Sequence, residues 1–83
     1  MNEVLLIGKI EEIEFEFMYE SKKISICNAK MKVNNMLVFA YGYDEVADMM
    51  YQNIKENDIE LIYGRLDSEG KIEVFEFEEY KML

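Results

Sequence analysis

Histidine, proline and tryptophan are absent from this chain of 83 residues, and cysteine occurs once, as Cys27. Without histidine there is no Ser–His or Cys–His nucleophile pair and no His-ligated metal site. A single cysteine forms no intramolecular disulfide and no thiolate metal cluster, and this count suits a reducing compartment. We therefore expect a cytoplasmic protein in which Cys27 is a small buried residue rather than a nucleophile.

Long apolar runs are also missing. No stretch reaches the ~18 apolar residues of a membrane span, and residues 4–7 are too few for the apolar region of a signal peptide. The content of 51% hydrophobic and 13% aromatic residues is nevertheless typical of a folded chain. A chain this short has room for one core, so we expect a single domain over residues 1–83 that is marginally stable unless subunits associate.

Acidic residues outnumber basic ones by 18 to 9, and the net charge of −9 taken whole argues against a polyanionic partner. The charge is unevenly distributed, however. Residues 21–43 contain four lysines and no acid, whereas residues 1–20 carry −5 and residues 44–83 carry −8. These four lysines are Lys22, Lys23, Lys30 and Lys32. Their function depends on where the fold places them.

Alternation of apolar and polar residues predicts five strands, at residues 3–19, 24–33, 36–42, 59–66 and 71–80. Gly8 marks a bulge or bend in the first, which is either one long strand or two bent halves. A change of apolar phase in the second strand predicts a bulge near Cys27-Asn28. Turns are expected at residues 20–23, at the pair Asn34-Asn35, which tolerates positive φ, and at residues 67–70.

One amphipathic helix is predicted after the third strand. Asp44 is a suitable N-cap, and Asn57 can close the helix in the left-handed conformation. Its apolar face, which we expect to close one end of the fold, comprises Val46, Ala47, Met50, Tyr51 and Ile54. The order β-β-β-α-β-β predicts an all-β fold class with one helix, the five-stranded OB-fold barrel. An SH3-like barrel is the alternative, but a helix at this point would be unusual in it.

Three segments resemble the bacterial single-stranded DNA-binding protein family. Residues 2–10, Asn-Glu-Val-Leu-Leu-Ile-Gly-Lys-Ile, are similar to its opening strand, and the pair Tyr41-Gly42 followed by Glu45-Val46-Ala47 resembles the passage into its helix. Residues 55–66 resemble its Lys-Gly-Asp turn and the strand that ends in Gly-Arg-Leu. The match spans nearly the whole chain in order. The family's tryptophans and long hairpin between strands four and five have no counterpart here, and Tyr43 stands where the family has a basic residue.

The resemblance implies a homo-oligomer that binds single strands without sequence preference during DNA replication, recombination and repair, with no cofactor and no catalysis. Family members pair their first strands across a two-fold axis. Here Val4, Leu5, Leu6 and Ile7 place large apolar residues on both faces of the first strand, more than one barrel can bury. We therefore expect a homodimer or homotetramer that forms through this strand.

The predicted nucleic-acid-binding site is the outer face of strands two and three, which binds oligonucleotides in OB-folds. Lysines there contact phosphates, and neighbouring aromatic rings stack on bases. The predicted site residues are Lys22, Lys23, Asn28, Lys30, Lys32, Phe39, Tyr41 and Tyr43. The ligand would be single-stranded DNA, or RNA. Without the resemblance, the same residues have another interpretation: the lysines are simply exposed to solvent, and a second subunit covers the apolar stripe beside them.

A second hypothesis rests on the acidic residues. The runs at residues 11–16 and 76–79 could suggest a hard-cation site. Because they alternate with apolar residues, we interpret them as the solvated faces of strands and expect no metal. Nothing in the sequence marks a desolvated carboxyl, so we expect no enzyme. The acidic C-terminal half supports the alternative function, an OB-fold that binds protein as an accessory subunit or mimics nucleic acid.

Overall fold

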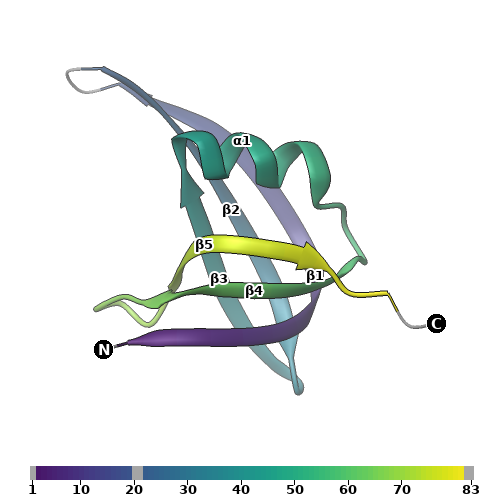
Figure 1. The fold of residues 1–83 in the computed structure, drawn as a ribbon. Helices are drawn as coiled ribbons and strands as arrows, with labels where there is room; N and C mark the ends of the chain where they lie inside the picture. Colours follow the sequence, from purple (N-terminus) through teal and green to yellow (C-terminus); the bar gives the residue numbers. More distant parts are fainter. Residues whose placement is uncertain (1, 20–21, 82–83) are drawn as a thin grey trace.

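The computed structural model describes residues 2–19 and 22–81, which form five strands and one helix. Along the chain these are β1 (Glu3–Tyr19), β2 (Lys23–Val33), β3 (Met36–Tyr43), α1 (Asp44–Asn53), β4 (Ile59–Leu66) and β5 (Ile72–Glu79). The strands close into a barrel in the order β1-β2-β3-β5-β4, and α1 lies across one end (Figure 1). The predicted element order and the five-stranded barrel are confirmed. The predicted turn at residues 20–23 lies partly outside the described residues.

Strand β1 serves two neighbours. Its 17 residues pair with β4 over residues 3–9 and with β2 over residues 9–19, antiparallel in both cases. A register shift between Ile10 and Glu12 places the extra residue, Glu11, in a β-bulge. The irregularity predicted at Gly8 therefore occurs three residues later, within one continuous strand. Beyond the bulge, β1 and β2 continue together past α1 (Figure 1).

The bulge predicted near Cys27-Asn28 is wrong, because β2 keeps a continuous register with β1 and β3 through these residues. The apparent change of phase has another cause. Ser25 takes an inward position, where its hydroxyl donates to the Asp48 carboxylate at 3.2 Å. Ile26 lies on the outer face opposite Tyr43, yet it is only 7% exposed. A polar residue inside and an apolar residue outside make a regular strand look irregular.

The tight hairpin between β2 and β3 is confirmed. Asn34 and Asn35 have φ angles of 50° and 66°, the left-handed pair that two-residue hairpins require. The loop between β4 and β5 also forms at the predicted place. There Asp67 Oδ1 accepts the backbone N–H groups of Glu69 and Lys71, at 2.8 and 2.9 Å. Such side-chain-to-backbone bonds hold a short loop in one shape.

The ends of α1 differ from the prediction. Tyr43 occupies the N-cap position without a side-chain hydrogen bond to the described helix, so the capping role predicted for Asp44 is wrong. Asp44 instead has a φ of 52°, and its carbonyl accepts the Ser25 hydroxyl at 3.3 Å. Asn57 is left-handed, with a φ of 75°, but the helix ends four residues earlier. The Asn57 N–H donates to the Ile10 carbonyl and ties the loop after α1 to the β1 bulge.

The core is formed by the inner faces of all five strands together with one face of α1. Its buried residues are Ile10, Cys27, Ala29, Met31, Ala40, Ala47, Met50, Ile54, Ile62, Ile72 and Val74. Cys27 is fully buried as predicted, and burial raises the pKa of its thiol to about 11. Tyr51, predicted on the buried helix face, is 57% exposed and packs beside Phe15 of β1. No helix in the described part of the chain is long and apolar enough to cross a bilayer.

The close approach of β4 and β5 at Gly64 supplies a stability test. A Cβ at Gly64 would overlap the carbonyl oxygen of Glu73 and lie 2.9 Å from its carbonyl carbon. Because both are backbone atoms of the paired strand β5, they cannot move aside as a flexible side chain could. We expect Gly64→Ala to lower the free energy of unfolding by about 1–3 kcal/mol, the usual cost of overpacking. Urea denaturation measures this. The control is Gly70→Asn, where no described atom lies within 4 Å and Asn tolerates the φ of 81°. Equal midpoints for both variants would contradict the expectation.

Glu60 is an acidic residue of β4 whose side chain is buried in the barrel. It shares the inward phase of β4 with Ile62, is 1% exposed, and neither carboxylate oxygen has a hydrogen-bond partner among the described residues. Burial, with a smaller contribution from Asp58 and Glu79, raises the pKa of Glu60 to about 7. The folded protein therefore binds this proton more tightly than the unfolded chain does.

The raised pKa predicts a stability that falls with rising pH. The stabilisation is complete below the ordinary pKa of 4.5 and is lost as the pH rises to about 7, because only the unfolded chain ionises freely in that window. The whole change is on the order of 3 kcal/mol, at 1.36 kcal/mol per pKa unit. Glu60→Gln should abolish this component and make the variant more stable than the parent at pH 8.

Urea unfolding at a series of pH values measures this pH dependence of the free energy of unfolding. Glu78→Gln, at an exposed position of β5, is the matched control and should keep the decline of the parent. Parallel pH profiles for the parent and Glu60→Gln would show that Glu60 does not titrate as described.

Candidate nucleic-acid interface

Strands β2 and β3 align the predicted site residues in cross-strand pairs. The register places Lys30 opposite Phe39, Asn28 opposite Tyr41 and Lys32 opposite Leu37. Opposed residues of antiparallel strands project on the same side of the sheet about 5 Å apart. Together these side chains form a surface that we call the outer β2–β3 face, which comprises Asn28, Lys30, Lys32, Leu37, Phe39, Tyr41 and Tyr43. The predicted outward orientation of these lysines and rings is confirmed.

The rings on this face differ in how open they are. Phe39 and Tyr43 are 44% and 45% exposed, and the Lys30 ammonium lies 5.9 Å from the centroid of Phe39. Tyr41 is half-buried, and its hydroxyl donates to Asp67 Oδ2 at 2.7 Å. Burial and this hydrogen bond raise the pKa of Tyr41, so the hydroxyl stays protonated. Phe39 and Tyr43 therefore offer the open rings, and Tyr41 anchors the β4–β5 loop against β3.

Lys22 and Lys23 lie on different sides of the β1–β2 ribbon. Lys22 lines a shallow hollow with Tyr43 on the outer side. Lys23 Nζ lies 4.0 Å from the centroid of Phe17, whose register partner Ser25 faces inward. Both lysines are distant from Lys30: Lys23 is seven positions away along β2, about 23 Å at the rise of a strand, and Lys22 is one residue farther. The structure brings Lys22 to the Tyr43 end of the outer β2–β3 face, whereas Lys23 lies on the other side of the ribbon.

Two further lysines border the face and were not predicted. Lys71 lines the same groove as Phe39 and Tyr41, and Lys9 pairs with Lys32 across β1 and β2. Lys71 could have been foreseen, because the loop between strands four and five borders the binding face in OB-folds. Lys9 depends on the register of β1 against β2, which the sequence does not show.

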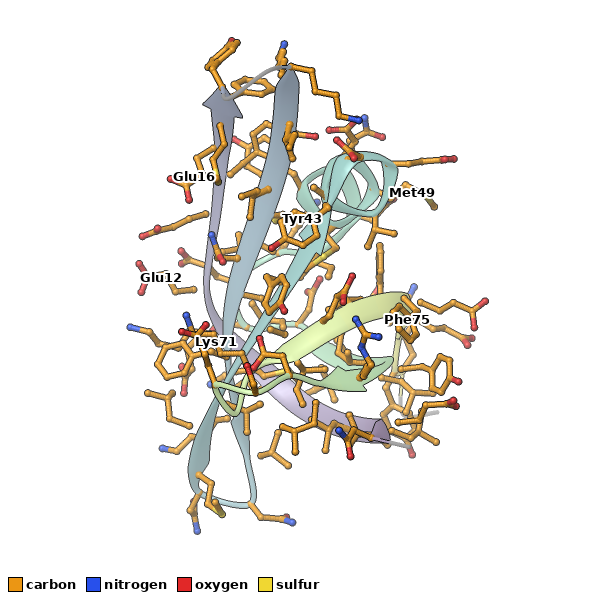
Figure 2. All side chains as sticks on the ribbon, turned by 90° about the vertical axis from the view of Figure 1, so that its left-hand side faces the viewer. Glu12, Glu16, Tyr43, Met49, Lys71 and Phe75 are labelled. Atoms are coloured by element: carbon orange, nitrogen blue, oxygen red, sulfur yellow. The ribbon has the colours of Figure 1, made fainter. Side chains whose placement is uncertain are left out.

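A column of acids on β1 flanks the lysines. Glu12 lies opposite Lys30, Glu14 opposite Asn28 and Glu16 opposite Ile26. Figure 2 looks onto this side of the molecule, with Glu12 and Glu16 projecting from β1 at the left of Tyr43 and Lys71. The Glu12 carboxylate is 3.2 Å from Lys30 Nζ, and the hydrogen bond to Lys30 lowers the pKa of Glu12. Interaction with the neighbouring Glu12 carboxylate in turn raises the pKa of Glu14.

These acids are solvated strand residues, as predicted, but their position beside the lysines was missed. Alternation alone tells that they face away from the core. The bulge at Glu11 decides that they share a side of the sheet with Lys30, and a bulge position is a matter of tertiary register. The basic character of the face is therefore partly neutralised by its own sheet.

Among the described residues, no group of three or more acidic or cysteine side chains could hold a metal ion. Glu60 is desolvated, which the sequence did not indicate, but it lies on β4, which pairs with β1 and β5 rather than with β2 or β3. The outer β2–β3 face is the best candidate site.

No protein-family model matches the chain, and no curated protein matches it either. Several solved structures do. An SSB domain from Synechococcus sp. aligns with a TM-score of 0.80 at 18% identity, over 93% of both chains. The protein PriB from Ralstonia solanacearum aligns with a TM-score of 0.78 at 14% identity, over 98% of this chain and 99% of that one.

The second OB-fold domain of replication protein A from Methanococcus maripaludis aligns with a TM-score of 0.66 at 14% identity. That alignment covers 95% of this chain and 84% of the other. At identities this low, such similarity shows a shared fold. The five-stranded barrel with a helix between the third and fourth strands is an OB-fold.

Proposed function

We propose that this protein binds single-stranded DNA with little sequence preference through the outer β2–β3 face, in replication, recombination or repair. The single observation that carries the proposal is the pairing of Lys30 with Phe39 and of Lys32 with Leu37 across β2 and β3. It puts cations and an open ring on one surface of an OB-fold, the combination that sequence-tolerant binding requires. The resemblance to the single-stranded DNA-binding protein family and the similarity to an SSB domain support it.

The proposed binding mode divides the work between lysines and rings. Phosphates would follow Lys22, Lys30, Lys32 and Lys71, while bases would stack on Phe39 and Tyr43, with Tyr41 and Asn28 between them. Each stacked base is worth about 1–3 kcal/mol. Lys23 would contribute only if a strand passes over the far side of the β1–β2 ribbon. RNA fits the same face, and neither a cofactor nor catalysis is needed for this function.

Electrostatics makes the binding modest. The net charge of −9 repels a polyanion, but this repulsion is screened beyond ~8 Å at physiological salt. Contacts between lysines and phosphates are shorter than that and persist. A phosphate at Lys30 must, however, displace Glu12, which is 3.2 Å away. We therefore infer weak binding that depends strongly on salt.

The outer lysines supply the first functional test. The double variant Lys30→Glu/Lys32→Glu should abolish binding of a fluorescent dT oligonucleotide, because it reverses two charges at the centre of the face. For the parent, four phosphate contacts predict a log–log salt slope of about −3, from roughly −0.7 per contact on single strands. Anisotropy titrations at several salt concentrations measure both.

Lys55→Glu/Lys81→Glu is the matched control for that experiment. It makes the same change in net charge at two exposed residues outside β2 and β3 and should leave the affinity near that of the parent. If the parent binds no oligonucleotide at low salt, or the face variant binds as well as the parent, the alternative function replaces this one. The acidic column of Glu12, Glu14 and Glu16 favours that alternative, a module that binds basic protein.

A second copy of the chain is the proposed partner at β1. In the described structure, residues 3–8 pair with β4 on one side only, so a strand edge is open on the other. Leu5 and Ile7 are 65% and 47% exposed there, and their register partners Tyr63 and Leu61 extend the apolar surface. We infer a homodimer or homotetramer through β1, because open edges and exposed apolar patches both favour association.

The oligomer has a direct test. Leu5→Glu/Ile7→Glu should give a monomer of 9.9 kDa by light scattering, whereas the parent should show two or four times that mass at high micromolar concentration. The added carboxylates would have to be buried unpaired at the β1 contact. Leu37→Glu, an exposed leucine on the outer β2–β3 face, is the control and should keep the mass of the parent. A monomeric parent would refute association through β1.

A further inference from the structure

A groove crosses the outer β2–β3 face toward β1. It has a volume of about 260 Å³, and the lining residues that matter here are Glu12, Glu14, Asn28, Lys30, Phe39 and Lys71. One wall is the open ring of Phe39, and the opposite wall is formed by carboxylates. Strand spacing of about 4.8 Å puts the β1 backbone at Glu12 roughly 10 Å from that of Phe39, a gap that one nucleobase can bridge.

An ionised carboxylate in such a groove contacts bases rather than phosphates. It accepts hydrogen bonds and donates none, and it repels the negative phosphate. The hydrogen bond to Lys30 lowers the pKa of Glu12, so Glu12 stays ionised at neutral pH. The Lys30 ammonium, 3.2 Å from the Glu12 carboxylate, adds a donor directly beside this acceptor.

We propose that Glu12 and Lys30 make this groove selective for guanine in the bound strand; the inference rests on the proposed binding of single-stranded nucleic acid. Unpaired bases are recognised on their Watson–Crick edges. Guanine presents two adjacent donors, N1–H and the N2 amino group, followed by the O6 acceptor. Two carboxylate oxygens beside an ammonium are the complement of that edge.

The other bases do not match this arrangement. Adenine and cytosine present one amino group beside a ring nitrogen acceptor, and thymine presents one N–H between two acceptors. Each would direct an acceptor lone pair at the Glu12 carboxylate, and unpaired acceptors next to an anion cost affinity. Phe39 stacks on any base, so the selection comes from the edge contacts alone. Because the Glu12 and Lys30 side chains are 45% and 40% exposed, the discrimination is at the low end for a bidentate base contact, about fivefold.

The test uses dT oligonucleotides in which one central thymidine is replaced by dG, dA or dC, so that guanine quadruplexes cannot form. Anisotropy titrations of the parent should give about fivefold tighter binding for the dG strand than for the other three. Inosine, which lacks the N2 amino group, should lose most of that gain. 7-Deazaguanine, altered on the opposite edge, should keep it.

Glu12→Gln should bind the dT strand more tightly, since Lys30 is released for phosphate, and should bind all four strands alike. Glu11→Gln removes the same charge at the exposed bulge position outside the groove and should keep the guanine preference. Equal affinities of the parent for all four strands, or a preference that survives Glu12→Gln, overturn the inference and leave the proposed function standing. Absence of binding to every strand overturns both.

Discussion

Strand β1 changes partner next to its bulge, pairing with β4 up to Lys9 and with β2 from Lys9 onward, and both halves of the barrel depend on this point. The bulge is also where the loop after α1 is fastened. The Ile10 N–H donates to the Asp58 carbonyl, and the Asn57 N–H donates to the Ile10 carbonyl, each at 2.8 Å. One strand can thus close a small barrel because a single extra residue bends it and two backbone hydrogen bonds hold the bend. The helix end and the β4 entry are positioned by the same contacts.

The bulge has an electrostatic consequence as well. It sets the phase in which Glu12, Glu14 and Glu16 emerge, and this phase is the one that Lys30 and Asn28 share across β2. Net charge therefore describes the protein poorly. The whole chain is strongly acidic, but the outer face alternates anion, cation and ring over three neighbouring strands, within distances at which salt screens little. Local pairing, rather than the sum of charges, decides what this surface can bind.

Most of the fold could be predicted from the sequence, because alternation, Asn-Asn turn chemistry and one amphipathic run are local signals. The outward orientation of Lys30 and Phe39 followed from the same alternation. The errors occur where local signals compete with tertiary contacts. Ser25 faces inward because Asp44 and Asp48 of the helix accept its hydroxyl, which made β2 look bulged. The position of the acids beside Lys30 depends on strand register, which only the assembled sheet defines.

A face that carries both signs of charge exchanges affinity for selectivity. A carboxylate 3.2 Å from a lysine weakens every phosphate contact that the lysine makes, whatever the sequence of the strand. In the proposed binding mode, the same carboxylate adds affinity only for a base edge that offers it hydrogen-bond donors. It therefore lowers the affinity for every strand but raises it for one kind of base. In the same proposed mode, stacking on Phe39 supplies the part of the binding free energy that does not discriminate between bases. In that mode the acids on β1 and the rings on β3 would have separate roles in one groove, and the lysines on β2 lie between them because the barrel places their strand between the other two.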